Sequence, residues 1–261
     1  MDLDFSSDEI DRYSRNILLA EVGGTGQAKL RAARVLVVGA GALGSPLLLY
    51  LAAAGVGTLG IVDHDAVALS NLQRQVAHTT GRVGMGKVAS AIQAIAALNS
   101  YVQIESWAVR CSAANAMSLV RDYDVICDGT DNFPTRFLLA DACHLAGRTL
   151  VSGAVLRFDG QVATFRPAGP CYRCLVPAAP PPGMVPTCSE AGILGAVTGV
   201  VGTLMATEVL KEIMGIGTTL AGRVLLWDAL ATRMRVVGLP RDPACSLCGD
   251  HPTITDLSGH G

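Results

Sequence analysis

The hydrophobic positions between residues 34 and 65 follow the pattern of two buried strands joined by a helix. Residues 35–38 form a continuous apolar run, as a strand covered on both faces requires. A largely apolar helix is expected over residues 43–54, and a second buried strand over residues 58–62. This order of strand, helix and strand predicts a βαβ unit.

Three glycines and an aspartate make this unit a candidate nucleotide site. Gly39, Gly41 and Gly44 have the spacing G-x-G-x-x-G, which permits a tight turn, the approach of a phosphate and close packing of the next helix. The N-terminus of that helix directs its N–H groups toward an anion. Asp63 follows about 20 residues later, where a carboxylate can hold a ribose. An ordinary glycine turn is the alternative, and the motif leaves the identity of the nucleotide open.

The rest of the chain continues this alternation of helices and strands. We expect a helix over residues 7–20 with Ser7 as its N-cap, and an amphipathic helix from residue 87 to 99. The further predicted strands are residues 103–109, a strand centred on 125–127, two strands within 148–165 and a hairpin within 224–239. The predicted fold is an α/β, Rossmann-like, mixed and mainly parallel sheet with helices on both faces.

Residues 191–207 carry no charged side chain and come close to the lower limit for a membrane span. They are rich in glycine and alanine, Glu190 and Glu208 flank them, and no basic segment orients them. We therefore predict a helix buried beneath the sheet. Residues 253–261 are predicted to be disordered.

The composition favours a folded protein without affinity for nucleic acid or membranes. Half of the 261 residues are hydrophobic, 16% are charged, and the formal net charge is −2. The acidic residues 1–9 lack the apolar run of a signal peptide. We therefore expect a cytoplasmic protein whose cysteines are reduced.

Two C-x-x-C pairs predict a structural zinc site. Cys171 and Cys174 form one pair, Cys245 and Cys248 the other, and four thiolates suit tetrahedral Zn²⁺ without an open position for substrate. Redox pairs or incidental cysteines are the alternatives. Cys188 stands apart, and its residue type fits a structural role as well as a reactive one.

The other cysteines are assigned from their surroundings. Cys127 and Cys143 are predicted to be core residues, and the role of Cys111 is open.

The charged residues around the predicted turn bear on the choice between NAD and ATP. A triphosphate requires several cations and a carboxylate for Mg²⁺. Arg15, Arg74, Lys87 and Asp131 could supply these. The alternatives are that the cations are solvated surface residues and that Asp131 caps the helix starting near Pro134.

Several longer motifs make the sequence similar to a known family. The chain resembles the MoeB/ThiF family of adenylyltransferases, which activate ubiquitin-like sulfur-carrier proteins for molybdopterin or thiamine biosynthesis. The resemblance extends from residue 12 to 248. It rests on Ser-Asn-Leu-Gln-Arg-Gln at 70–75, Cys-Asp-Gly-Thr-Asp-Asn at 127–132, Cys-Tyr-Arg-Cys at 171–174 and Thr-Cys-Ser-Glu-Ala-Gly at 187–192.

The resemblance implies a role for each candidate residue. It implies that Asp63 holds the ATP ribose, that Asp131 positions Mg²⁺ with Asn132 beside it, and that the four paired cysteines hold structural zinc. Arg15 would reach the phosphates from the other subunit of a homodimer, and Cys188 matches a cysteine that some members use in sulfur transfer. The residues implied around the nucleotide and its phosphates are Gly39, Gly41, Ala42, Gly44, Ser70, Asn71, Arg74 and Lys87.

The chain departs from the family pattern at two positions. Ala42 replaces a glycine of the usual turn, and Asn16 stands where glutamine is usual. A sulfurtransferase domain does not follow Cys248, so we expect a separate sulfurtransferase or persulfide donor.

The sequence is interpreted as a single adenylation domain over residues 1–261. The nucleotide-binding core covers about residues 30–165, and the part that binds zinc and the carrier covers about 166–252. The expected reaction is ATP-dependent adenylation of a carrier ending in Gly-Gly, with release of pyrophosphate. An NAD-dependent oxidoreductase and a non-catalytic nucleotide-binding scaffold are the alternatives.

Overall fold

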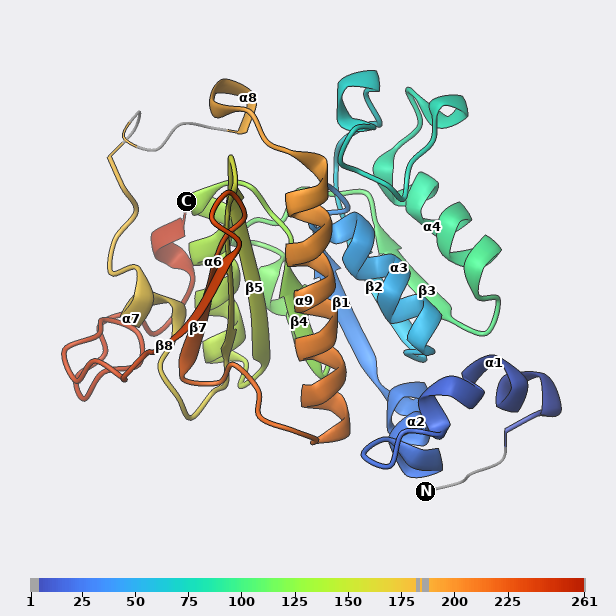
Figure 1. Cartoon of the computed structure of the whole chain (residues 1–261). Helices are drawn as coiled ribbons and strands as arrows, with labels where there is room; N and C mark the ends of the chain where they lie inside the picture. The colour runs from blue at the N-terminus through green and yellow to red at the C-terminus, as the bar shows by residue number, and fades with distance from the viewer. Residues whose placement is uncertain (1–4, 182–183, 185–187, 261) are drawn as a thin grey trace.

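A single eight-stranded sheet organises the molecule (Figure 1). The structure is a computed structural model that describes residues 5–181, 184 and 188–260. The strand order is β3-β2-β1-β4-β5-β6-β7-β8, parallel from β3 to β5 and antiparallel from β5 to β8. The strands are β1 (Arg34–Val38), β2 (Thr58–Val62), β3 (Gln103–Trp107), β4 (Val125–Asp128), β5 (Thr149–Leu156), β6 (Asp159–Phe165), β7 (Arg223–Asp228) and β8 (Arg233–Gly238). The predicted mixed, mainly parallel sheet is therefore confirmed.

Helices cover both faces of the sheet, as expected. Figure 1 shows α9 and α3 in front of the strands and α6 behind them. The α-helices are α1 (Ser7–Ile17), α2 (Gly23–Ala32), α3 (Gly44–Ala54), α4 (Lys87–Leu98), α5 (Ala116–Val120), α6 (Phe133–Leu145), α7 (Tyr172–Leu175), α8 (Cys188–Ala191) and α9 (Gly195–Met214).

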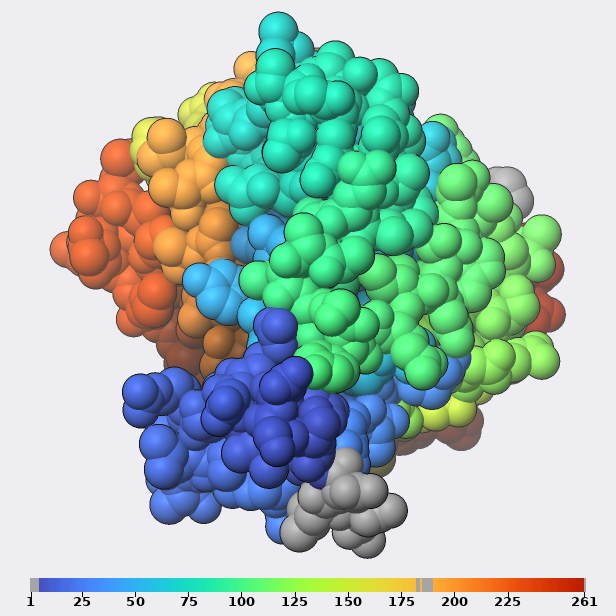
Figure 2. All heavy atoms as spheres, turned by 90° about the vertical axis from the view of Figure 1, so that its right-hand side faces the viewer, coloured from blue at the N-terminus to red at the C-terminus, as the bar shows by residue number. Residues whose placement is uncertain are grey.

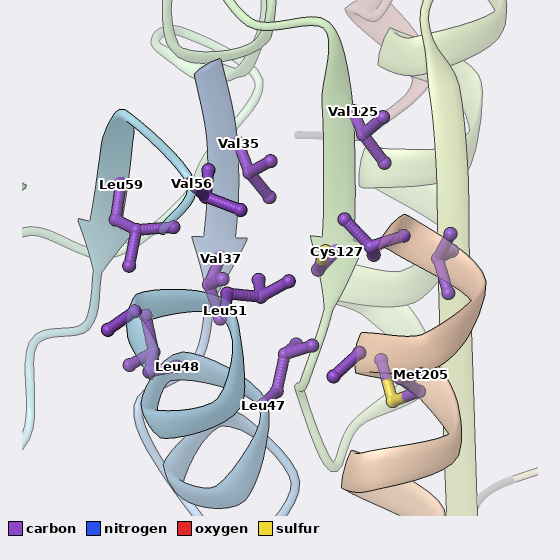
Figure 3. Packing of buried hydrophobic residues seen from close by; sticks show 14 of the residues in the cluster. Val35, Val37, Leu47, Leu48, Leu51, Val56, Leu59, Val125, Cys127 and Met205 are labelled. Carbon is purple, nitrogen blue, oxygen red and sulfur yellow. The ribbon is translucent and has the colours of Figure 1, made fainter. Parts of the chain in front are cut away.

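The central strand β1 explains the uninterrupted apolar run. Val35 and Val37 pack into a core with α3 and α9, whereas Leu36 and Val38 pack into a second core with α5 and α6. All four side chains are at most 3% exposed. Figure 3 shows Leu47 and Leu51 on one side of β1, with Met205 approaching from α9. Both faces of the strand require apolar residues because both are covered.

The turn after β1 requires glycine at two positions. Gly39 has φ +95°, a conformation that strains residues with a Cβ. A Cβ at Gly44 would lie 1.8 Å from the Gly39 carbonyl oxygen, which cannot move aside because it is backbone. The close contact between helix and turn therefore depends on the absence of a side chain at Gly44.

We predict that Gly44→Ala lowers the free energy of unfolding by about 3 kcal/mol or more, because the turn and α3 must separate. Urea unfolding measures this change. Gly81→Ala is the matched control, since a Cβ there meets nothing within 4 Å. Equal stability of the two variants would contradict the assigned contact.

The first helix differs from its predicted bounds. It covers Ser7–Ile17, and its N-cap is Ser6 rather than Ser7. The Ser6 hydroxyl accepts a hydrogen bond from the Glu9 N–H, and the Glu9 carboxylate accepts one from the Ser6 N–H. Ser6 caps the helix rather than Ser7 because this reciprocal pair requires a glutamate three residues after the cap, and Glu9 is three residues after Ser6. The third strand also ends earlier than predicted, at Trp107.

The apolar segment near residue 200 forms the predicted buried helix. Helix α9 starts at Gly195, after the short helix α8, and its Val201, Met205 and Val209 are fully buried. In the described part of the chain, no helix is long and apolar enough to cross a membrane.

The prediction of a disordered tail is wrong. Leu257 is buried in the core beside α6, and the His260 Nε2 lies 2.7 Å from the carboxylate of Asp141. A fully buried carboxylate such as Asp141 requires partners, and the tail supplies one of them.

Candidate active site

A cavity of about 680 Å³ contains most of the predicted site residues. It lies at the carboxyl ends of β1, β2 and β4, where ligands gather in open α/β sheets. The predicted residues that line it are Gly39, Gly41, Ala42, Asp63, Arg74, Lys87, Asp131 and Asn132. Gly44, Ser70, Asn71 and Arg15 are not among its lining residues.

Asp63 is held in place by backbone N–H groups. One of its carboxylate oxygens accepts a hydrogen bond of 2.8 Å from the Ala40 N–H, and the other accepts one of 2.8 Å from the Asp65 N–H. Each oxygen keeps a second lone pair for a ligand hydroxyl. The carboxylate is thus fixed at the end of β2 and still borders the cavity.

The two cations of the following loop are also positioned by local contacts. The Lys87 ammonium is nearly buried and lies 2.8 Å from the Asp65 carboxylate. Its hydrogen bond to that carboxylate lowers the pKa of Asp65. Arg74 donates to the Ser70 carbonyl at 3.0 Å, and the Asn71 side chain accepts from the Ala68 N–H at 3.3 Å. Ser70 and Asn71 therefore shape the loop that presents Arg74.

Asp131 is free to bind a cation. Asn132, and not Asp131, is the N-cap of α6, since its side chain accepts a hydrogen bond of 2.9 Å from the Thr135 N–H. Asp131 is exposed to the cavity and makes no hydrogen bond or ion pair with other described residues. An unpaired carboxylate at this position fits Mg²⁺, which prefers oxygen ligands.

A buried acid shapes the loop that carries Asp131. Asp128 is 1% exposed, and one of its oxygens accepts hydrogen bonds from the Thr130 N–H and hydroxyl at 3.0 and 2.6 Å. Its other oxygen accepts from the Ser152 hydroxyl at 2.9 Å. Asp128 therefore acts on the site by fixing the backbone.

The second half of the cavity was not predicted from the sequence. It is lined by Asp159 and Gln161 from β6, Trp227 from β7, and Arg233 and Arg235 from β8. In the sequence, charged residues on an antiparallel hairpin look like solvent-facing positions. Only the folded sheet shows that they border the same cavity as the glycine turn.

Residues 193–195, where α9 begins, border both halves. Ile193 lines the cavity and forms a parallel bridge with Arg157 of the β5–β6 turn. Gly195 lies so close to the loop carrying Arg74 that a Cβ would be 2.1 Å from the Gln73 carbonyl oxygen. The segment thus contacts the walls on both sides.

Arg15 lies apart from the cavity of its own chain. It is exposed on α1, which Figure 1 shows at the lower right, far from the loops above the carboxyl ends of the strands. Cys188 is the first residue of α8, but its side chain lies outside the described part of the structure.

The two C-x-x-C pairs meet as predicted. Their four Sγ atoms all lie within 4.8 Å of one another, with 3.5 Å between Cys171 and Cys245 and 3.4 Å between Cys174 and Cys248. A tetrahedron with Zn–S bonds of about 2.3 Å has edges of about 3.8 Å. The donor set and its spacing therefore suit zinc.

An ion pair connects this cysteine cluster to helix α6. Arg173, between two of the cysteines, donates to both carboxylate oxygens of Asp141 on α6 at 2.8 and 2.7 Å. The two side chains are 16% and 0% exposed. Since Asp141 also contacts His260, one buried acid anchors both the cysteine cluster and the chain's end.

The remaining described cysteines are buried. Cys127 and Cys143 are core residues, as predicted. Cys111 lies in the wall of the cavity, and burial raises the pKa of its thiol to about 11. A thiol with this pKa is protonated at neutral pH and is a poor nucleophile.

The chain is similar to proteins of known activity. A model of the ThiF family matches residues 13–247. The sulfur carrier protein adenylyltransferase of Thermus thermophilus is 50% identical over 259 residues, covering 97% of this chain and 96% of that protein. The adenylyltransferase and sulfurtransferase MOCS3 of Bos taurus is 52% identical over 257 residues, covering 98% of this chain and 56% of that protein. This chain thus spans little more than half of that relative's length.

Solved structures share the fold. Escherichia coli MccB crystallised with ATP has a TM-score of 0.81 at 21% identity, covering 91% of this chain and 74% of that chain. MccB bound to MccA-N7isoASN has a TM-score of 0.82 at 22% identity, covering 95% of this chain and 76% of that chain. At this identity the likeness concerns the fold alone.

Proposed function

We propose that this chain, which belongs to the ThiF family and is an adenylyltransferase, joins AMP to the C-terminal glycine of a ubiquitin-like sulfur-carrier protein and releases pyrophosphate. The observation that carries the proposal is the cavity with two halves, one beside the glycine turn and one beneath the β6–β8 strands. A reaction between a nucleotide and a second, extended substrate needs both.

In the nucleotide half, Asp63 would hold the ribose and Gly39, Gly41 and Ala42 would receive the nucleotide on their backbone. Arg74 and Lys87 would neutralise the phosphates. Asp131 would hold Mg²⁺, which when bound supplies further charge neutralisation at the triphosphate. These assignments rest on the side chains' common border with one cavity.

The chemistry requires positioning and charge neutralisation but no general base. The carrier's C-terminal carboxylate is already ionised, so its oxygen attacks the α-phosphorus directly. An acyl–phosphate bond forms as the bond between the α-phosphorus and the bridging oxygen breaks, and pyrophosphate leaves with that electron pair. The cavity supplies cations for this step in Arg74 and Lys87.

In the second half, the carrier's C-terminal segment would pass beneath Ile193 toward the α-phosphate. Ile193 bridges to Arg157 and Gly195 packs against the backbone of Gln73, so residues 193–195 lie between the two walls of the cavity. A Gly-Gly end has no side chains to clash with these residues. The body of the carrier would rest on the exposed edge strand β8, where Met234 and Val236 are 54% and 49% exposed.

Zinc bound by the four cysteines would be structural, because four protein thiolates leave no open position. Cys188 would act, if at all, in a later transfer of sulfur to the carrier, with sulfur from a separate donor. The carrier would serve the synthesis of molybdopterin or thiamine.

Transfer of label from ATP tests the proposed reaction. ATP labelled at the α-phosphate should transfer its label to a carrier ending in Gly-Gly, and ATP labelled at the γ-phosphate should not. A carrier lacking its last glycine is the control. Label on the carrier from the γ-phosphate would contradict adenylation.

We further propose that the active unit is a homodimer in which Arg15 reaches the partner's site. Arg15 is exposed and remote from its own cavity. Figure 2 shows the face that contains α1 and the segment before α4, and these elements carry exposed apolar side chains. Leu18 and Leu19 directly follow α1, and Leu69 lies in the segment before α4; these side chains are 73%, 54% and 68% exposed. Exposed apolar side chains of this size are candidates for an interface.

Mixing two inactive chains tests this arrangement. Arg15→Ala and Asp131→Ala should each be inactive alone, whereas the heterodimer has one site with both groups. A statistical mixture should regain up to about a quarter of the wild-type activity, since half the dimers are mixed and each has one intact site. Absence of activity, with heterodimers shown to form, would place Arg15 outside the partner's site.

A further inference from the structure

His78 connects the loop that carries Arg74 to the glycine turn after β1. It is 5% exposed and lies in the loop between Arg74 and Lys87. Its Nε2 is 2.9 Å from the Ala40 carbonyl oxygen in the glycine turn, and its Nδ1 is 2.8 Å from the hydroxyl of Ser90 on α4. Both partners are fully buried.

These contacts determine which nitrogen of His78 carries the proton. A backbone carbonyl only accepts hydrogen bonds, so Nε2 must donate to Ala40 and the Ser90 hydroxyl donates to Nδ1. Burial lowers the pKa of His78, and the charges of Lys87 and Arg82 lower it further, against the hydrogen bond to Ala40, which raises it. The imidazole is therefore neutral and satisfied at both nitrogens.

The glycine turn has other supports besides His78. The Gly39 N–H donates to the Val62 carbonyl at 2.8 Å, and the Ala40 N–H donates to Asp63. Among the hydrogen bonds between described residues, only the one from His78 to Ala40 joins the loop 70–87 to the turn 39–44. Loss of His78 would therefore leave the turn in place and remove the direct hydrogen bond that joins the loop to it.

We propose that His78 is a positioning residue that fixes the cations Arg74 and Lys87 relative to the turn that receives the nucleotide. The inference rests on the proposed function of the cavity and adds a residue to it. Transfer to a phosphate depends on the placement of charges around it, and a displacement of about 1 Å can cost about 100-fold in rate. The hydrogen bond between turn and loop therefore lies where a small displacement of the cations would lower the reaction rate.

Two substitutions separate the hydrogen bond from the packing. His78→Phe keeps a flat ring but donates no hydrogen bond, and we expect the kcat of carrier-dependent pyrophosphate exchange to fall by about 10- to 100-fold. His78→Gln retains an N–H donor and should stay within about fivefold of wild type. AMP has one phosphate where ATP has three, so its affinity depends less on the cations and should change less than about twofold in either variant because the turn is intact.

Tyr123→Phe is the matched control for lost stability. It removes a partly buried hydrogen bond of 2.6 Å to Glu105 of β3, and neither residue lines the cavity, so it should lower the melting temperature without changing exchange. Unchanged exchange in His78→Phe would overturn the proposal. An equal loss of AMP and ATP affinity would also overturn it, because His78 would then support the turn itself.

The test also distinguishes failure of the proposed function. Absence of exchange by the wild-type protein with its carrier would refute adenylation. ATP and AMP binding, measured by calorimetry without carrier, would still test His78. His78→Phe should then weaken ATP binding by about tenfold and AMP binding by less than about twofold.

Discussion

Replacing Cys174 by serine will remove zinc from the chain and lower its melting temperature in the same variant. The four thiolates lie at distances that suit one tetrahedral ion. Structural zinc contributes on the order of 10 kcal/mol of apparent binding free energy, and a serine hydroxyl is a poor substitute for a thiolate. We expect one zinc per chain in the wild-type protein by elemental analysis, and a large loss of both metal and stability in Cys174→Ser.

Cys111→Ala serves as the control because it removes a cysteine outside the cluster. It should retain one zinc. The effect of Cys174→Ser should also extend to α6, because Arg173 in the same turn anchors the cluster to Asp141. Wild-type protein that keeps the same melting temperature when its metal is removed would contradict a structural zinc site at these cysteines.

Asp131→Ala will abolish carrier-dependent pyrophosphate exchange, by about 100-fold or more. The estimate follows if charge stabilisation by the metal is worth several kcal/mol. Asp131 borders the cavity without a partner among the described residues, so its loss should leave the fold unchanged. Asn132→Ala differs, because it removes the cap of α6 and should cost stability.

Cys188→Ala separates adenylation from sulfur transfer. The attack of a carboxylate on a phosphate needs no thiol, so this variant should retain exchange. It should lose at most the later formation of a carrier thiocarboxylate. Loss of exchange in a folded Cys188→Ala protein would contradict this division between the two residues.

The fold could be predicted where the residue pattern of a single segment indicates its structure. The apolar run of β1 indicates that both faces of the strand are buried. The spacing of Gly39 and Gly44 reflects the close approach of Gly44 to the Gly39 carbonyl oxygen. The contact between the two C-x-x-C pairs could be predicted because a tetrahedral metal ion needs all four thiolates as ligands.

The contacts that could not be predicted join segments far apart in the sequence. His260 and Asp141 are 119 residues apart, and a buried aspartate looks like any helical aspartate in the sequence. His78 contacts Ala40 through a carbonyl group that every residue has. The choice of Asn132 over Asp131 as a cap depends on side-chain direction, since both residue types cap helices well.

The exchange of labelled pyrophosphate into ATP tests the central claim most directly. The wild-type chain should catalyse this exchange only when a sulfur-carrier protein ending in Gly-Gly is present. It should not catalyse it with the same carrier lacking its terminal glycine. Exchange that is independent of the carrier, or absent with every Gly-Gly carrier tested on folded, zinc-loaded protein, would contradict the assignment of this cavity as the site of carrier adenylation.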